Sequence, residues 1–137
     1  MPIPSPGRLD LIAYRGSIYL HDVVFLGQAL YDTSFYLTVR AFRDAPGDPL
    51  IFLQTTAAGT QGMSSVVFTE DGVTSTRLTI QIDEDTIMET LPFDSSGRPA
   101  DAPDVSLVYD IHILSFEAPR YRALEGAFTI SAGVTRL

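Results

Sequence analysis

The chain has 137 residues, which is enough for one domain with a hydrophobic core of its own. A composition of 45% hydrophobic and 10% aromatic residues is typical of a globular protein and excludes a mainly disordered chain. The absence of cysteine excludes disulfides, thiolate metal sites and cysteine nucleophiles, and a formal net charge of −8 opposes a general nucleic-acid-binding role.

The N-terminus is rich in proline. Pro2, Pro4 and Pro6 alternate, which favours an extended arm over a helix. We expect such an arm over residues 1–8, either as a disordered tail or as a clasp that becomes ordered on a neighbouring molecule. Residues 1–7 lack the cationic flank and apolar run of a secretory signal, and no stretch reaches the roughly 18 apolar residues of a membrane span. We therefore expect no contact with a membrane.

Strand signals fill the first half of the chain. Residues 9–14 and 17–26 are predicted strands, with Gly16 at a bulge or bend between them. Residues 27–32 are expected to form either a loop or a strand that switches sheets. Residues 35–43 then alternate, so that Phe35, Leu37, Val39 and Ala41 share one face.

Turns and a second hairpin follow. Residues 44–49 are a dense turn signal before a short strand over residues 50–55. Residues 65–69 and 73–83 are predicted to pair as a hairpin, because Asp71-Gly72 supplies the positive φ angles of a two-residue turn. In its second strand Leu78, Ile80 and Ile82 should face inward.

A single helix is predicted over residues 83–91. Asp83 can act as its N-cap, and Pro92 stops it. Residues 92–104 form the longest expected loop, which by its length is a candidate contact surface.

The last part of the chain, residues 105–132, reads as a long hairpin. Leu107, Tyr109, Ile111 and Ile113 alternate with polar or smaller apolar residues, the period-two pattern of a strand with one buried face. The chain then turns at residues 117–120 and returns. About seven to nine short strands separated by regular turns predict a β-sandwich formed by residues 9–137 as one domain.

Few residues suggest chemistry. Asp110 and His112 lie two apart on one strand face, where they form either an acid/base or metal pair or a solvent-facing polar patch. The acids between Asp83 and Glu89 resemble a cation site in composition, but Met88 stands where a calcium loop needs glycine, and helix capping explains the same residues. The six tyrosines are either sugar-stacking platforms or half-buried sheet residues. No nucleophile or phosphate-binding motif occurs, so we expect no enzyme, no cofactor and no metal.

Four segments carry a resemblance to a known family. They are a strand running into Tyr14-Arg15-Gly16, a strand before a short acidic helix at Leu78–Ile87, the segment Val108–Leu114 with its aromatic-Asp pair, and the closing segment Leu124–Ile130. Together they resemble small tailed-phage virion proteins, in particular the N-terminal immunoglobulin-like module of upper baseplate and tail-attachment proteins. The resemblance implies an all-β, immunoglobulin-like antiparallel β-sandwich with one short helix near residues 83–91, and it carries over no catalytic residue.

Two functions from different classes follow. The first is a structural virion protein of the tail, baseplate or neck, assembled in the host cytoplasm with other virion proteins and with copies of itself. The second is a carbohydrate-binding module of the same fold, and a capsid decoration protein is a third option. We expect interaction residues in the arm and in the long loop, namely Pro2, Pro4, Pro6, Arg98, Pro99 and Asp101.

Overall fold

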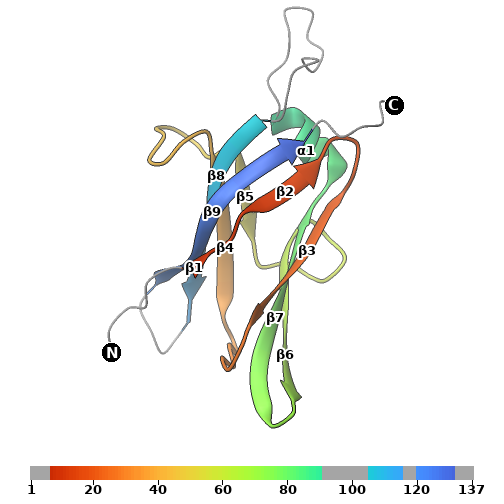
Figure 1. Ribbon diagram of the computed structural model, residues 1–137, viewed down its shortest axis with the longest axis vertical. Coiled ribbons are helices and arrows are strands. Elements are labelled where there is room, and N and C mark those ends of the chain that lie inside the picture. Colours follow the sequence, from red (N-terminus) through yellow and green to blue (C-terminus); the bar gives the residue numbers. More distant parts are fainter. Residues whose placement is uncertain (1–6, 91–104, 116–119, 132–137) are drawn as a thin grey trace, which may run out of the picture.

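Two β-sheets make up most of the protein (Figure 1). The computed structural model describes residues 7–90, 105–115 and 120–131. The larger sheet has the strand order β1-β9-β8-β4-β5, with β2 also paired to β9, and the smaller sheet has the order β3-β7-β6. The strands are β1 (Gly7–Arg8), β2 (Leu11–Tyr14), β3 (Tyr19–Phe25), β4 (Ser34–Arg40), β5 (Ile51–Gln54), β6 (Gly62–Glu70), β7 (Val73–Ile82), β8 (Val105–Leu114) and β9 (Tyr121–Ser131).

This strand order is that of an immunoglobulin-like sandwich. Strands β3, β7 and β6 take the places of strands B, E and D, and β9, β8, β4 and β5 those of G, F, C and C′. The first strand is split into β1 and β2, and both pieces run parallel to β9, while the other pairings between strands are antiparallel. The structure therefore confirms the predicted all-β sandwich class.

Alternation along the strands builds the core. Leu107, Tyr109, Ile111 and Ile113 of β8 are buried, as their period-two spacing predicts. Leu78, Ile80 and Ile82 of β7 are fully buried in the facing sheet and belong to the same apolar cluster. Full burial of such side chains contributes about 1.5–3 kcal/mol each, so this cluster holds the two sheets together.

The β6–β7 hairpin turns at Asp71-Gly72. The φ angles of these two residues are 52° and 80°, the positive values that a two-residue hairpin turn requires. The hairpin reaches beyond the strands of the larger sheet at one end of the long axis (Figure 1). It therefore presents its turn as a projecting tip.

The predicted helix is present as α1 (Glu84–Thr90), with Glu84 and Asp85 in its first turn. Ile87 is fully buried and Met88 packs against the core, as expected for its apolar face. A predicted strand end is wrong, because β4 stops at Arg40 and Ala41 belongs to the following loop. The reason is the φ of 60° at Asp44, which together with Gly47 bends the chain away from the sheet.

Several expectations fall outside the described residues. Most of the predicted arm, residues 1–6, does so, and the last two residues of the arm form β1. The predicted interaction residues, the long loop over 92–104 and most of the turn over 117–120 also lie outside the described part of the chain.

Candidate functional site

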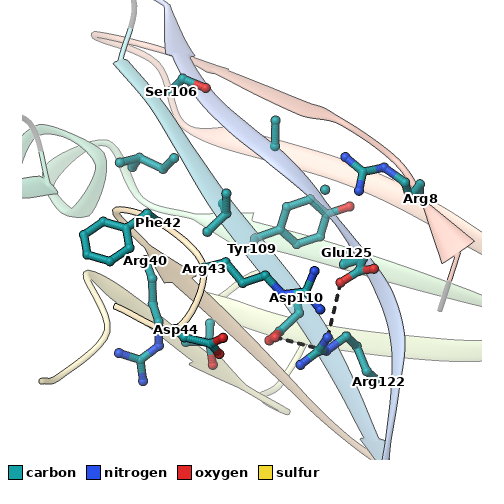
Figure 2. A pocket seen from close by; sticks show the side chains of 15 residues that line it. Arg8, Arg40, Phe42, Arg43, Asp44, Ser106, Tyr109, Asp110, Arg122 and Glu125 are labelled. Atoms are coloured by element: carbon teal, nitrogen blue, oxygen red, sulfur yellow. Dashed lines mark hydrogen bonds and ion pairs between the residues drawn. The ribbon is translucent and has the colours of Figure 1, made fainter. Parts of the chain in front are cut away.

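A hollow of about 260 Å³ lies on the outer face of the larger sheet (Figure 2). Its floor is formed by residues of β4, β8 and β9, most of them on the outer face of the sheet, and one wall is the loop over residues 41–49. We call it the arginine hollow, because four arginines line it. The residues around it are Arg8, Thr38, Arg40, Phe42, Arg43, Asp44, Ser106, Leu107, Val108, Tyr109, Asp110, Arg122, Glu125, Gly126 and Ala127.

Arg40 holds the loop wall in place. Its guanidinium donates hydrogen bonds to the carbonyl oxygens of Ala45, at 3.0 Å, and Gly47, at 2.7 Å. The loop needs such an anchor because Asp44 and Gly47 both have positive φ angles and leave the sheet ladder. Arg40 therefore shapes the hollow, and both of these hydrogen bonds come from its Nη1.

The floor contains a three-residue ion network. Arg122 Nε lies 3.3 Å from an Asp110 carboxylate oxygen, and Arg122 Nη1 donates to Glu125 at 3.3 Å (Figure 2). The Nε contact is an ion pair without hydrogen-bond geometry. All three side chains are between a fifth and about a third exposed, so the network orders the floor and adds little to stability.

The predicted Asp110–His112 pair is present beside this network. His112 Nε2 lies 3.5 Å from an Asp110 oxygen, and His112 Nδ1 accepts a hydrogen bond of 3.2 Å from Arg120 Nε. An accepting Nδ1 places the proton of a neutral imidazole on Nε2, which faces the carboxylate. Both partners of the pair are thus engaged with arginines, the arrangement of a cross-strand polar patch.

Metal binding has no support in the described residues. Within them, no group of three or more His, Cys, Asp or Glu side chains is placed to hold a metal ion. That covers the Asp110–His112 pair as well as the acids from Asp83 to Glu89, which lie at the start of α1 and along it. A cation at Asp110 would also have to displace the Arg122 guanidinium.

Among the residues that the structure describes, the exposed tyrosines do not lie on one strand face that could stack on a sugar. Tyr36 stacks on Phe52 with ring centroids 6.2 Å apart, and the Arg120 guanidinium lies 5.4 Å from the Tyr36 ring centroid. Tyr14 and Tyr31 are the more exposed tyrosines, but one ends β2 and the other lies in the loop before β4. The ring of Tyr36 is therefore already used by protein groups.

Two tyrosines are buried in the core, and one of them, Tyr109, also lines the hollow. The Tyr109 hydroxyl donates a hydrogen bond to the carbonyl oxygen of Leu9, and burial raises the pKa of Tyr109, with a smaller contribution from the nearby Asp10 carboxylate. Burial also raises the pKa of Tyr19. The Tyr19 hydroxyl has no hydrogen-bond partner among the described residues. Raised phenol pKa values keep both groups neutral at physiological pH, so neither is set up as a base.

Two arginines of the hollow remain open. Arg8 on β1 and Arg43 on the loop wall form no hydrogen bond or ion pair with a described residue, and both are exposed. Figure 2 shows the Arg43 side chain extending into the hollow and the Arg8 side chain approaching it from β1. Four arginines and three carboxylates give the lining a formal charge of +1, in a chain of formal charge −8.

The sequence did not predict this hollow, since its residues come from positions 8 to 127. The one available signal was the pair Arg40 and Arg43 at the edge of a Gly- and Pro-rich turn. The outward direction of Arg122 could not be predicted, because β9 contains a bulge at this point. Leu124 pairs with Ile111 and Arg122 pairs with His112, so Ala123 is the extra residue. Strict alternation from Leu124 would have placed Arg122 on the buried face.

Comparisons with known proteins identify no family. No family model matches the chain, and no curated protein matches it. Among solved structures it is similar to a family 123 glycoside hydrolase from Clostridium perfringens, with 11% sequence identity and a TM-score of 0.34. The match covers 96% of this chain and 24% of the hydrolase, so the chain spans about a quarter of that protein. At this score the likeness carries no argument about activity.

Within the described residues, no helix has the length and apolar character of a membrane span.

Proposed function

We propose that this chain is a structural module of a bacteriophage tail, baseplate or neck, which assembles through protein–protein contacts and has no catalytic activity. The observation that carries the proposal is an exposed apolar surface where two open sheet edges meet. Its members are Ile12, Tyr14, Ile18 and Leu20, and we call it the β2–β3 edge surface.

Both strands at this surface are outermost in their sheets. In the described part of the chain, β2 pairs only with β9, and β3 pairs only with β7. β3 is seven residues long, so it presents a row of unpaired backbone N–H and C=O groups. Monomeric proteins usually protect such an edge with proline, lysine or a bulge, because an open edge is a template for pairing with another chain. β3 has no such device in its sequence, YLHDVVF, apart from the charge of Asp22.

The side chains at this edge are apolar as well as exposed. Ile12 and Tyr14 are each 53% exposed, Ile18 is 49% exposed and Leu20 is 59% exposed. All four fall within one stretch of nine residues around the turn between β2 and β3, at the edges of the two sheets to which these strands belong. Exposed apolar side chains along two open strand edges are typical of a contact with another protein.

The other side of the sandwich is different. There Thr55, just after β5, forms a bridge with Met63 near the start of β6, and the Thr56 N–H donates to the Met63 carbonyl at 2.8 Å. The two sheets are therefore joined on that side and open on the β2–β3 side. An assembly contact at β2 and β3 explains this asymmetry.

Light scattering behind a sizing column tests the proposal. We expect the wild-type protein to form a multimer at micromolar concentration, and Leu20→Lys to shift it toward monomer by placing a charge in the contact. Val66→Lys is the matched control, because Val66 is 60% exposed in the same sheet but on β6. Electron microscopy of the wild-type multimer should show rings or tubes.

A wild-type protein that stays monomeric at concentrations up to about 0.3 mM would overturn self-assembly. The dissociation constant would then exceed that concentration, and the free energy of association would be weaker than about 5 kcal/mol. Equal loss of the multimer in both variants would overturn the assignment to the β2–β3 edge surface. A monomer that binds an oligosaccharide would instead support the carbohydrate-binding alternative.

A further inference from the structure

Positive charge is concentrated in the arginine hollow. Of the seven arginines in the described residues, four line it. The chain as a whole has nine basic and seventeen acidic residues. The surface outside the hollow is therefore strongly acidic, and the hollow is the place where an acidic partner meets the least repulsion.

Two of the four arginines in the hollow form hydrogen bonds or ion pairs with other described residues, and the other two do not. Arg40 fixes the loop wall and Arg122 is engaged with Asp110 and Glu125. Arg8 and Arg43 have no hydrogen bond or ion pair with a described residue, and they approach the hollow from β1 and from the loop (Figure 2). Guanidinium groups present paired N–H donors in a planar fork, which matches the two oxygens of a carboxylate. Such a frame suits a carboxylate held between Arg8 and Arg43.

The chain itself offers a matching group at a distance from the hollow. Glu70 and Asp71 are adjacent, exposed, and carried by the two-residue turn between β6 and β7. This turn projects at the end of the long axis away from the 41–49 loop (Figure 1). A hollow of about 260 Å³ has room for the side chains of a turn, and a turn that is already ordered loses little entropy on binding.

We infer that the arginine hollow of one copy receives Glu70 and Asp71 of a second copy. The inference rests on the proposed self-assembly and adds a second contact to it. Because the hollow and the turn are different surfaces, the contact is head-to-tail, and repetition produces a ring if the rotation closes and a filament if it does not. Both shapes suit a module of a tail, baseplate or neck.

A charge exchange tests the contact on the full chain. We expect Arg43→Glu and Glu70→Arg each to weaken association about tenfold, because each places like charges together, and the double variant to return to within about threefold of wild type. Arg77→Glu and Glu84→Gln are the matched controls, since both residues are exposed and lie outside the hollow and the turn. Both controls should associate as wild type does.

Two further measurements distinguish the carboxylates of a second copy from a small anion as the ligand of the hollow. Raising the salt concentration should weaken wild-type association more than that of Arg43→Glu, because the contact is ionic. Sodium sulfate should inhibit more than sodium chloride at equal ionic strength if the hollow takes an oxyanion. Sulfate binding at the hollow with no effect of Arg43→Glu on assembly would show a small-anion site and overturn the contact with the turn.

The outcomes distinguish the two proposals. Assembly that is lost in Leu20→Lys but unchanged in Arg43→Glu and Glu70→Arg overturns the hollow contact and leaves the proposed function standing. Single variants that weaken association without recovery in the double variant also overturn the pairing of these two sites. A monomeric wild-type protein overturns the self-assembly on which both depend.

Discussion

The Tyr109 hydroxyl donates a hydrogen bond to the carbonyl oxygen of Leu9, a residue 100 positions earlier in the chain. The bond lies where the first strand breaks into β1 and β2. At the same break, the Asp10 carboxylate accepts a hydrogen bond from the backbone N–H of Ala127 at 3.0 Å, and the Leu9 N–H donates to the backbone carbonyl of Glu125 at 3.0 Å. Two side-chain hydrogen bonds, from Tyr109 and to Asp10, thus supplement the backbone bond at the break, and β8 helps to hold the first strand onto β9.

Tyr109→Phe should destabilise the fold by about 1 kcal/mol. The substitution removes one hydrogen bond and leaves the carbonyl of Leu9 without its partner, while the ring keeps its place in the core. Urea unfolding monitored by circular dichroism measures the change. A variant as stable as wild type would show that this bond does not anchor the first strand.

Tyr19→Phe is the matched substitution with the opposite expectation. Tyr19 is also buried, but its hydroxyl has no partner among the described residues. Removing a buried polar group without a hydrogen bond costs nothing in the folded state and should stabilise the protein by up to about 1 kcal/mol. The edge-on contact of the ring with Phe128, with centroids 5.6 Å apart, should persist. Destabilisation in the same urea experiment would mean that the hydroxyl has a partner.

Alkaline pH should unfold the protein through the same two tyrosines. Burial raises both folded-state pKa values above the ordinary value of 10.0, so above about pH 10 the unfolded chain loses these protons first. The stability is fully present below pH 10 and falls as pH rises, with a limiting slope of about 2.7 kcal/mol per pH unit for two protons. Either Tyr→Phe variant should remove half of that slope. Urea titrations at a series of pH values measure it, and an unchanged slope in both variants would contradict the assignment.

The sequence predicted those parts of the fold that depend on local pattern. Alternation placed the inward residues of β7 and β8, and Asp71-Gly72 marked a turn, because each signal is set by residues a few positions apart. The parallel pairing of β2 with β9 was not predictable in this way. It depends on contacts between positions more than 100 apart, such as that of Asp10 with Ala127.

The candidate site was predictable only in part. Asp110 and His112 were expected on one face because they are two residues apart on a strand, and they do lie together. Arg122 joins Asp110 because a bulge at Ala123 turns it outward, and no periodicity indicates a bulge. The hollow also needs a loop that Arg40 folds back on itself, which is a tertiary effect.

Asp110→Asn should change stability by only about 0.5 kcal/mol. The carboxylate contacts Arg122 and His112 at 3.3 Å and 3.5 Å, but it is 29% exposed, and partly exposed ion pairs are weak. Added zinc should leave the melting temperature of the wild-type protein unchanged, because Arg122 already neutralises the carboxylate. A rise in melting temperature with zinc that disappears in Asp110→Asn would instead reveal a metal site at the pair.

Gly126→Ala tests the close approach of the first strand to β9. A Cβ at position 126 would overlap the backbone carbonyl of Leu9 and would lie 3.0 Å from an Asp10 carboxylate oxygen. Because the obstacle is backbone, β1 and β2 would have to move off β9, and we expect the free energy of unfolding, measured with urea, to fall by about 2–3 kcal/mol.

Gly7→Ala is the control on the same pair of strands. Its Cβ would meet the flexible end of Leu124 at 3.3 Å, and Gly7 is not among the residues with positive φ, so stability should change by less than about 0.5 kcal/mol. Equal effects of the two substitutions would show that the first strand is not held against β9 at the break.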